Sequence, residues 1–353
     1  MPSAADSLRV LVADDQSDVL QAIRLLLKSA GHAAETVDSP AGLLRAAESR
    51  SFDVILMDMN YARDTTSGQE GLEVLRALRD KHNATPVIVM TAWGSVDLAV
   101  EAMRRGASDF VQKPWDNDRL LGSIVEQADR GRAVLRAREE ADIARNVQRK
   151  LLPAGSREQR SMRWAGRCLP ARDVGGDYFD FLDSGPEQLG VVLADVSGKG
   201  VAAALLMANL QALFRTHTDL RTINQLFLES TPPEQYATMF YGILDDRHRT
   251  FHYVNAGHPA ALVCRRGGAV ERLSSTTFPL GLFGDWTSDY GAVSLGAGDA
   301  LVIYSDGVCE GDDAWIAERA VTGSPEEIAD RITQQACDGG QTDDVTVVVG
   351  RAV

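Results

Sequence analysis

The segment DVILMDMN, residues 53–60, decides the fold of the N-terminal part of the chain. It is an apolar run of strand length that ends in an acid, Asp58, and other short apolar runs flank it, separated by amphipathic helical segments. Strands that alternate with helices predict an α/β fold, a doubly wound parallel sheet of five strands. The predicted strands are Arg9–Ala13, His32–Val37, Asp53–Met57, Pro86–Met90 and Asp109–Val111, and the predicted helices are Val19–Lys28, Ala41–Ser49, Gly71–Lys81 and Val96–Arg104.

A long segment without strand character follows, from Asp118 to Leu152. It contains no Pro and one Gly, and its apolar residues recur at helical spacing, so we expect a helical connector. A charged stretch, Arg136–Asp142, interrupts a strict heptad pattern. A solvated helical spacer and a dimerising coiled coil therefore both remain open. Pro153 and Gly155 mark the end of the connector.

The C-terminal part of the chain, from Arg163 onward, has mostly strand-like patterns with Gly and Asp at their ends. Two helical stretches stand out, Val201–Phe214 and Pro325–Ala336. We therefore expect a second domain in which sheets dominate and helices pack outside them. The predicted strands are Asp177–Leu182, Gly190–Val196, Tyr236–Leu244, Thr250–Asn255, Ala260–Cys264, Ala300–Tyr304 and Val345–Val349.

The composition narrows the class of protein. The 353 residues include 36 Lys and Arg against 50 Asp and Glu, a net charge of −14, which repels nucleic acid and anionic lipid. The cysteines form no CxxC pair and are too few for a disulfide framework. No apolar run reaches the roughly 20 residues of a membrane helix, and the N-terminus lacks a basic, apolar signal. We expect an intracellular, cytoplasmic protein.

Five polar side chains follow the predicted strands of the N-terminal sheet: Asp14, Asp15, Asp58, Thr91 and Lys113. Because the carboxyl ends of parallel strands share one edge, these side chains are expected to converge there. Three carboxylates suit a hard cation such as Mg²⁺, which would neutralise an incoming phosphoryl group while one carboxylate attacks it. The lysine and the threonine hydroxyl would bind phosphoryl oxygens.

Four motifs in order resemble a response-regulator receiver domain: VLVADD (10–15), DVILMDMN (53–60), VIVMTA (87–92) and DFVQKP (109–114). The resemblance covers about residues 8–125 and implies a flavodoxin-like fold, a sensor histidine kinase as partner, and Asp58 as phosphoacceptor. It implies that Mg²⁺ is bound by Asp14, Asp15, Asp58 and the main-chain carbonyl of Asn60. Thr91 and Phe110 would be the switch pair, and Lys113 would precede a cis peptide bond to Pro114.

The segment after the phosphoacceptor departs from the receiver pattern. It reads DMNYARDTTSGQEGL, with Ala62 where the family usually has Pro and with several extra residues before the next Gly. Asn60 precedes the change, so its implied role is retained. The altered segment therefore affects the surface that would contact a kinase.

A second set of acids lies beside small residues at strand boundaries: Asp177 in VGGDYFD, Asp195 in ADVSGKG, Asp306 in YSDGVCE and Asp343 in QTDDVT. Glycine lets the backbone approach closely, so these carboxylates can share a cleft. Four carboxylates without His or Cys favour Mn²⁺ or Mg²⁺ over zinc. Two such ions can bridge a hydroxide and stabilise a leaving oxygen, which implies phosphomonoester hydrolysis.

The C-terminal motifs resemble the metal-dependent PPM serine/threonine phosphatases, in their bacterial SpoIIE/RsbU branch, over about residues 145–353. Further matches are ARNVQRKLLP (144–153), TPPEQYATMFYGILD (231–245), VNAGHPAALV (254–263) and FPLGLF (278–283). The resemblance implies an α/β/β/α sandwich of two sheets and two Mn²⁺ or Mg²⁺ ions. It implies that Asp195 bridges both metals, that the carbonyl of Val196 assists, that Asp177 binds one metal, and that Asp306 and Asp343 bind the other.

Three further residues lie near these motifs. Arg172 is a candidate for binding the substrate phosphate through its fork of donors. Asp344 is expected beside the metal site. His258, in NAGHP, could suggest a general acid, but a packed or turn-forming histidine is the favoured interpretation. The segments between Phe214 and Leu226 and between Asp306 and Asp343 are shorter than is usual for this branch, which affects substrate docking more than the metals.

The combined interpretation is a two-component response regulator whose output is a protein phosphatase. The expected organisation is a receiver domain at 8–125, a helical connector or coiled coil at 126–155, and a phosphatase domain at 156–353. The leading substrate is a phosphorylated STAS-type anti-sigma-factor antagonist in a partner-switching circuit. If the connector is a coiled coil rather than a solvated spacer, a homodimer would form through it. The alternative is a phosphorylation-gated binding scaffold with an inactive phosphatase-like domain. A transcription factor is disfavoured, because no helix-turn-helix with a basic recognition helix is visible.

Overall fold

The computed structural model describes residues 7–61, 68–81, 84–91, 96–185, 187–309 and 311–353. The chain divides into two compact units, Met1–Glu139 and Glu140–Val353, and each is described by itself. No helix in these described ranges combines the length and the apolar character of a membrane span.

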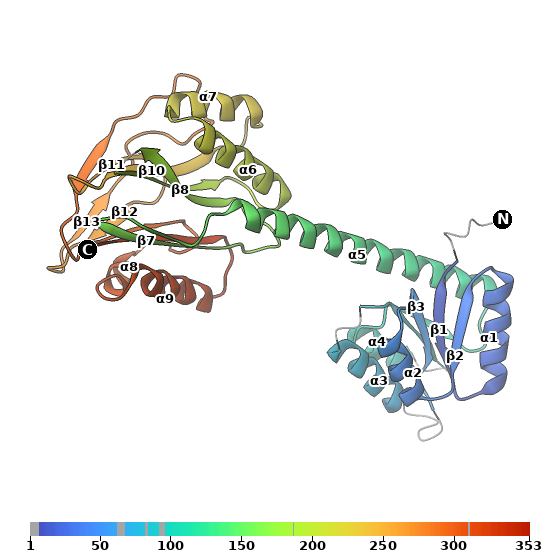
Figure 1. Cartoon of the computed structure of the whole chain (residues 1–353). Helices are drawn as coiled ribbons and strands as arrows, with labels where there is room; N and C mark the ends of the chain where they lie inside the picture. Colours follow the sequence, from blue (N-terminus) through green and yellow to red (C-terminus); the bar gives the residue numbers. More distant parts are fainter. Residues whose placement is uncertain (1–6, 62–67, 82–83, 92–95, 186, 310) are drawn as a thin grey trace. The chain divides into compact units, whose positions relative to one another are not determined.

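The first unit is built on a parallel sheet of five strands, as predicted (Figure 1). The strand order is β2-β1-β3-β4-β5. Three of its strands are buried along almost their whole length, because helices cover both faces of the sheet. This burial explains why they read as continuous apolar runs. The strands are β1 (Arg9–Ala13), β2 (Ala33–Val37), β3 (Val54–Asp58), β4 (Val87–Thr91) and β5 (Asp109–Gln112).

Alternate residues of the strands face two separate cores. Leu11, Ile55 and Val89 pack with α2 and α3, whereas Val10 and Leu56 pack with α1 and the first turns of α5. The helices are α1 (Ser17–Ser29), α2 (Pro40–Ser49), α3 (Gln69–Asp80), α4 (Val96–Arg104) and α5 (Asn117–Leu151). Because the connections leave from one edge of the sheet, that edge gathers the side chains that follow β1, β3, β4 and β5.

Helix α5 is a single helix of 35 residues that continues from the first unit into the second. It ends at Leu151, and Pro153 lies just beyond, where a proline cannot continue a helix. Apolar side chains stand exposed along its middle and second half. They are Val134 at 51%, Leu135 at 47%, Ile143 at 64% and Val147 at 56% exposed.

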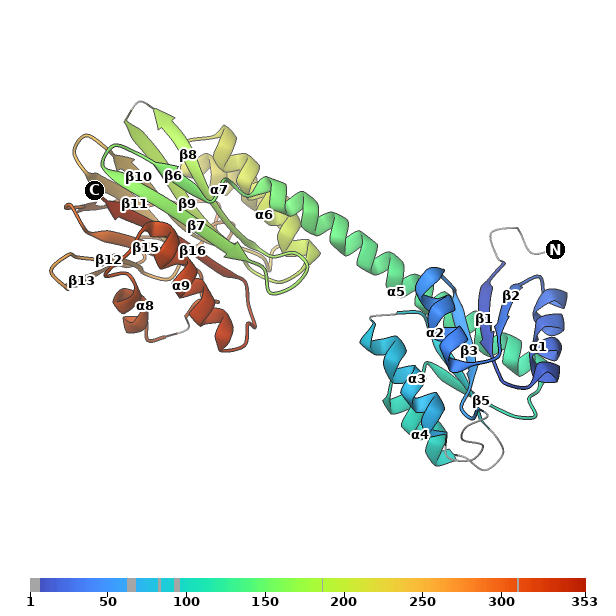
Figure 2. The same cartoon turned by 60° about the horizontal axis from the view of Figure 1, so that its bottom comes forward.

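The second unit is a sandwich of two mainly antiparallel sheets, ordered β14-β11-β10-β9-β8 and β13-β12-β15-β16-β7-β6. A core of apolar side chains fills the space between the sheets. Helices α6 (Val201–Thr216) and α7 (Leu220–Ser230) cover the outer face of the first sheet, and α8 (Ala314–Arg319) and α9 (Pro325–Asp338) cover that of the second (Figure 2). The predicted α/β/β/α sandwich is confirmed.

The strands of the two sheets extend the predicted set. The first sheet contains β8 (Asp177–Gly185), β9 (Gln188–Val196), β10 (Ala237–Asp245), β11 (Thr250–Ala256) and β14 (Gly291–Ser294). The second contains β6 (Ser156–Glu158), β7 (Met162–Leu169), β12 (Ala261–Cys264), β13 (Val270–Leu273), β15 (Ala300–Tyr304) and β16 (Val345–Ala352). The short outer strands β6, β13 and β14, the longer strand β7, and the helices α7 and α8 are additions to the sequence prediction.

Candidate phosphoacceptor and metal sites

The first acidic cluster forms where β1 and β3 end. Carboxylate oxygens of Asp14, Asp15 and Asp58 lie within 4.8 Å of one another, as expected for side chains at one edge of a parallel sheet. Lys113, which follows β5, brings its Nζ to 2.6 Å from Asp14 Oδ2 and 3.1 Å from Asp58 Oδ1. Asp14 and Asp58 are buried and Asp15 is exposed, so the cluster is open to solvent on one side.

The charges in this cluster are not balanced. Burial raises the pKa of Asp58, and the nearby Lys113 only partly offsets that rise. The Lys113 ammonium contacts two of the three carboxyl groups, and its single positive charge is fewer than their three negative charges. Hard oxygen ligands with surplus negative charge and an open side fit a Mg²⁺ ion, which commonly keeps several waters.

The other predicted receiver residues surround the cluster. Thr91 ends β4 and is buried, whereas Phe110 on β5 is 38% exposed. The Asn60 side chain has a buried Oδ1 without a hydrogen-bond partner among the described residues. The Lys113–Pro114 peptide bond is cis. Ala62 and the residues after it, up to 67, lie outside the described residues, and the roles assigned to the switch pair and to Asn60 stay predictions.

Sequence reasoning missed Tyr61 in this cluster. Its ring is buried, and its hydroxyl lies 3.5 Å from the carbonyl oxygen of Ala13. Burial raises its pKa, and the neighbouring acids, Asp58 first, raise it further, so the hydroxyl stays a neutral hydrogen-bond donor beside the carboxylates. Its position within three residues of Asp58 was the available signal.

The second acidic cluster is assembled from both sheets of the sandwich. Asp177 and Asp195 stand opposite each other on the paired strands β8 and β9. Asp306 follows β15 and Asp343 precedes β16, which pairs with β15. Burial raises the pKa of Asp195 to about 7, and the charges of Asp306 and Asp343 add to the rise. The four acids predicted from sequence therefore act on one another electrostatically.

Asp177 is the acid of this cluster whose surroundings best fit a metal ligand. It is 3% exposed, and its Oδ2 has no hydrogen-bond partner among the described residues. Burial and the neighbouring Asp195 hold its pKa well above the usual range. A buried carboxylate oxygen without a donor is costly unless a cation binds it, so the donor set fits a divalent metal. The cluster is wider than the first one, since within the described ranges only the receiver acids meet the 4.8 Å separation.

Glycines bring the backbone close to these acids. A Cβ on Gly176 would lie 2.7 Å from the carbonyl oxygen of Val196, the carbonyl predicted to assist the metals. A Cβ on Gly175 or Gly307 would collide with Asp344, with its carboxylate in the first case and its carbonyl oxygen in the second. The glycines of the VGGD and SDGV motifs are therefore needed, because a side chain at these positions would clash with Val196 or Asp344.

Asp344 fixes the loop that leads to Asp177. Its Oδ2 accepts a hydrogen bond from the Gly176 N–H at 2.7 Å, and its Oδ1 accepts one from the Ala171 N–H at 2.8 Å. It therefore lies beside the site, where the sequence placed it, and the structure adds its contacts with the loop. Sequence reasoning could not identify these contacts because the partners are more than 160 residues apart.

Two cations border the cluster. Lys199 Nζ lies 2.7 Å from Asp343 Oδ2, and this hydrogen bond raises the lysine pKa. Arg172 is exposed and close enough to Lys199 for the two charges to repel. The structure therefore brings the predicted phosphate ligand Arg172 to the border of the acids. Lys199, in the SGKG part of the quoted motif, was missed.

His258 is a packed residue. It is 4% exposed, and its Nδ1 lies 2.9 Å from Thr238 Oγ1. Burial lowers its pKa to about 3, so the ring is neutral near pH 7. A neutral, enclosed imidazole supports the packed interpretation over the general acid.

The first unit is similar to known receiver domains. The model of the response regulator receiver domain matches residues 10–125. The transcriptional regulatory protein FixJ of Bradyrhizobium diazoefficiens is 30% identical over 196 residues, which are 56% of this chain and 90% of FixJ. The chain belongs to the response regulators.

This response regulator carries a SpoIIE-type output domain of the protein serine/threonine phosphatase class. The model of stage II sporulation protein E matches residues 185–353. The phosphoserine phosphatase RsbU of Bacillus subtilis is 28% identical over 183 residues, covering 49% of this chain and 54% of RsbU. The structure of the RsbU and RsbW domains of Rv1364c from Mycobacterium tuberculosis is 28% identical with a TM-score of 0.48, covering 54% of this chain and 61% of that one.

Proposed function

We propose that this response regulator is a metal-dependent phosphoserine and phosphothreonine protein phosphatase controlled by phosphorylation of Asp58. The observation that carries the enzymatic part is the buried, unpartnered Oδ2 of Asp177 within the cluster of Asp195, Asp306 and Asp343. The observation that carries the control is the Asp58 carboxylate, held beside Lys113 in the same chain. The proposed domains are the receiver at 8–125, the connector at 126–155 and the phosphatase at 156–353.

In the receiver, an oxygen of Asp58 would attack the phosphoryl group carried by a sensor histidine kinase, and the phosphorus–nitrogen bond of phosphohistidine would break. Asp14, Asp15, Asp58 and the Asn60 carbonyl would hold Mg²⁺, which neutralises charge on the transferring group. Lys113 already contacts Asp58, so its ammonium is placed to bind a phosphoryl oxygen. Thr91 would donate its hydroxyl to another oxygen, and Phe110 would move with it.

In the phosphatase unit, Asp195, the Val196 carbonyl and Asp177 would hold one Mn²⁺ or Mg²⁺ ion, and Asp195, Asp306 and Asp343 a second. Bound there, such ions would supply a hydroxide for hydrolysis and stabilise the leaving oxygen. Arg172 would bind the substrate phosphate through its exposed guanidinium. The Asp344 carboxylate would keep Asp177 in place through its hydrogen bonds to the loop.

The proposed substrate is a phosphorylated STAS-type anti-sigma-factor antagonist. The similarity to RsbU and SpoIIE supports it, because RsbU is named for phosphoserine hydrolysis. A serine phosphate adds close to two negative charges at neutral pH, enough to change a protein–protein contact when it is removed.

Helix α5 is the proposed coupling element. At its C-terminal end the carbonyl of Leu151 accepts hydrogen bonds from the Gln211 and Arg215 side chains of α6. Arg145 forms an ion pair with Asp173 in the loop that leads to Asp177. A rotation or ordering of this end of α5 would therefore move α6 and the metal-binding loop together. The exposed apolar residues of α5 would pair with those of a second copy, which gives a homodimer.

The test is Mn²⁺-dependent hydrolysis of p-nitrophenyl phosphate, followed by hydrolysis of a phosphorylated STAS protein. Wild type should release phosphate with Mn²⁺ and not with a chelator, and Asp306→Asn should lose at least about tenfold in rate, because a metal ligand is removed. Asp338→Asn, an exposed acid on α9, is the matched control. Retained binding of the phosphoprotein without phosphate release in wild type would favour the scaffold instead.

A further inference from the structure

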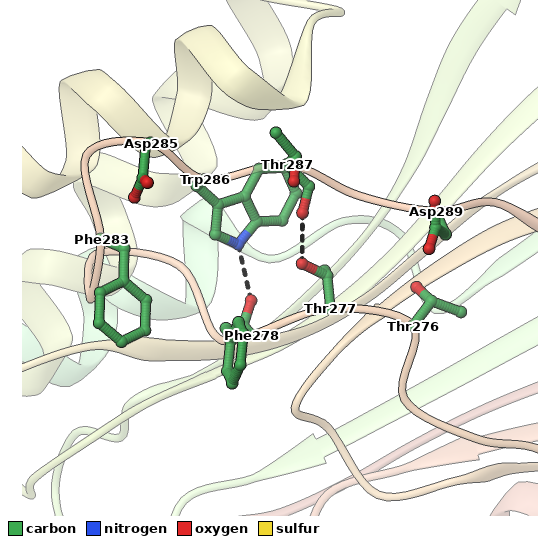
Figure 3. A pocket seen from close by; sticks show the side chains of 8 residues that line it. All are labelled: Thr276, Thr277, Phe278, Phe283, Asp285, Trp286, Thr287 and Asp289. Atoms are coloured by element: carbon green, nitrogen blue, oxygen red, sulfur yellow. Dashed lines mark hydrogen bonds between the residues drawn. The ribbon is translucent and has the colours of Figure 1, made fainter.

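A pocket of about 460 Å³ opens in the loop between β13 and β14 of the phosphatase unit (Figure 3). Two phenylalanine rings, Phe278 and Phe283, form one end of it. Phe278 is 66% exposed and Phe283 is 48% exposed, and their ring centroids lie 5.5 Å apart at an interplanar angle of 74°. The rings therefore contact each other edge to face. Because both side chains are exposed, part of their aromatic surface faces solvent.

Two acids border the same pocket. Figure 3 shows Asp285 on the side of Phe283 and Asp289 near Thr276. Both acids are exposed, and neither has an ion-pair or hydrogen-bond partner among the described residues. Aromatic faces beside unpaired carboxylates form a site for a cation with an apolar stem, since the ring faces and the carboxylates both attract positive charge.

The pocket is held open by buried hydrogen bonds. The Trp286 Nε1–H donates to the Phe278 carbonyl at 2.7 Å, and the Trp286 ring is buried in the core beneath α6 and α7. Asn224 of α7 is fully buried, with Oδ1 accepting from the Gly281 N–H and Nδ2 donating to the Phe283 carbonyl, each at 2.9 Å. A preformed pocket loses little conformational freedom on binding.

The pocket is connected to the catalytic end of the sandwich. Leu280, two residues after Phe278, forms an antiparallel bridge with Ala237. Ala237 pairs in turn with Val196, the neighbour of Asp195. Two strand spacings separate Leu280 from Val196, roughly 10 Å. An extended peptide whose phosphoserine lies at the acids could reach the pocket with a side chain roughly three to five residues away.

We propose that this pocket binds an arginine side chain of the phosphoprotein substrate, with its stem on Phe278 and Phe283 and its guanidinium toward Asp285. The proposal deepens the proposed function and rests on it for the identity of the substrate. Arginine fits better than lysine because its planar guanidinium stacks on aromatic faces and binds a carboxylate through two parallel hydrogen bonds. The net charge of −14 favours the approach of a basic segment.

The first experiment compares phosphoserine peptides that differ in one position. Arginine or glutamine is placed three, four or five residues from the phosphoserine on either side, and kcat/KM is measured with Mn²⁺. Wild type should prefer the best arginine peptide about fourfold, mainly through KM, since two exposed contacts are each worth roughly a factor of two. The preference should fall to about twofold in Asp285→Asn and likewise in Phe278→Leu, because each change removes one of the two contacts. It should persist in Asp338→Asn.

The second experiment does not depend on turnover. The Trp286 indole N–H resonance, assigned with Trp286→Phe, is followed while the full chain is titrated with N-acetyl-arginine amide or with its citrulline analogue. We expect a saturable shift with arginine alone, absent in Asp285→Asn. Equal responses to both compounds, or none, would overturn the pocket even if the enzyme is active. If p-nitrophenyl phosphate is not hydrolysed, the proposed function fails and this titration still decides the pocket. An equal preference for a leucine peptide would assign the site to apolar side chains and contradict the arginine proposal.

Discussion

The side-chain amide of Gln148 is bonded twice to the backbone of Gly175. Its Nε2 donates to the Gly175 carbonyl at 2.7 Å, and its Oε1 accepts from the Gly175 N–H at 3.1 Å. Gln148 lies in the last turn of α5 and is 8% exposed. Gly175 is two residues before Asp177, so this pair joins the end of the connector to the loop that positions a predicted metal ligand.

Substituting Gln148 should therefore affect both stability and metal use. Gln148→Leu leaves the buried N–H and C=O of Gly175 without partners and should lower the free energy of unfolding by about 2 kcal/mol. The same change should weaken Mn²⁺ activation of p-nitrophenyl phosphate hydrolysis, because the Asp177 loop loses its tie to α5. Denaturant unfolding and a Mn²⁺ titration of the rate measure the two effects. Arg149→Ala, an exposed neighbour, should change neither, and a Gln148→Leu protein with an unaltered Mn²⁺ titration would contradict the link.

The fold of the first unit could be predicted closely because its central strands are buried on both faces. Strands β1, β3 and β4 read as unbroken apolar runs, and the cluster of receiver acids follows from where they end. In the second unit, β13 and β14 are short and mostly exposed, so they carry little apolar signal. Helix α7 was not predicted from the sequence, because the polar residue Asn224 interrupts the apolar stripe that the helix buries.

The candidate sites show a different limit of sequence reasoning. The acids could be listed because each sits beside a glycine or at a strand end. The contacts that support these acids could not be predicted from the sequence. Gln148 contacts Gly175 and Asp344 contacts Gly176 only because distant segments pack together. Lys199 stands within a quoted motif, yet its ion pair with Asp343 depends on a loop more than 140 residues away.

Lys113 should be needed for the stability of the receiver without metal. It is 18% exposed and contacts two buried acids, so Lys113→Met leaves Asp14 and Asp58 without their cation. We expect the free energy of unfolding to fall by about 2–4 kcal/mol, and Mg²⁺ to restore more stability to the variant than it adds to wild type. Chemical unfolding with and without Mg²⁺ measures this. Lys81→Met, which breaks an exposed pair with Glu48, should cost less than about 1 kcal/mol. An equal Mg²⁺ response in both proteins would argue against a cation site at these acids.

His258 should make the second unit less stable in acid. The pKa of the folded state is about 3, below the ordinary value of 6.5, so between these values the unfolded chain binds a proton that the folded chain does not. Stability is therefore retained above pH 6.5 and lost as the pH falls, by about 1.4 kcal/mol per pH unit. Between about pH 6.5 and pH 5 wild type should lose about 2 kcal/mol more than His258→Gln. Unfolding curves of both proteins give the difference, in which the other titrating groups cancel, and parallel pH profiles would disprove the assignment.

The exposed apolar side chains of α5 should mediate dimerisation. Ile143 and Val147 are spaced four residues apart on one helical face and are 64% and 56% exposed. Ile143→Glu with Val147→Glu should convert a dimer into a monomer, because two carboxylates would have to be buried at the interface. Sedimentation equilibrium gives the mass. Arg149→Glu, an exposed charge reversal on the same helix, should leave it unchanged, and a monomeric wild type would refute the homodimer.

Phosphorylation of Asp58 should change phosphatase turnover through α5. Acetyl phosphate or beryllofluoride with Mg²⁺ should alter the rate of p-nitrophenyl phosphate hydrolysis by wild type by at least about threefold, since allosteric couplings are commonly worth 1–3 kcal/mol. Asp58→Ala cannot form the acyl phosphate and should show the same rate with and without the donor. The control Asp18→Ala, which removes an exposed acid on α1, should respond as wild type does. Gln148→Leu should take up phosphate at Asp58 normally yet respond weakly, because its receiver is intact and its tie to Gly175 is missing. A full response in Gln148→Leu would mean that the signal passes through Arg145 or α6 instead, and a response in Asp58→Ala would place the control outside the receiver cluster.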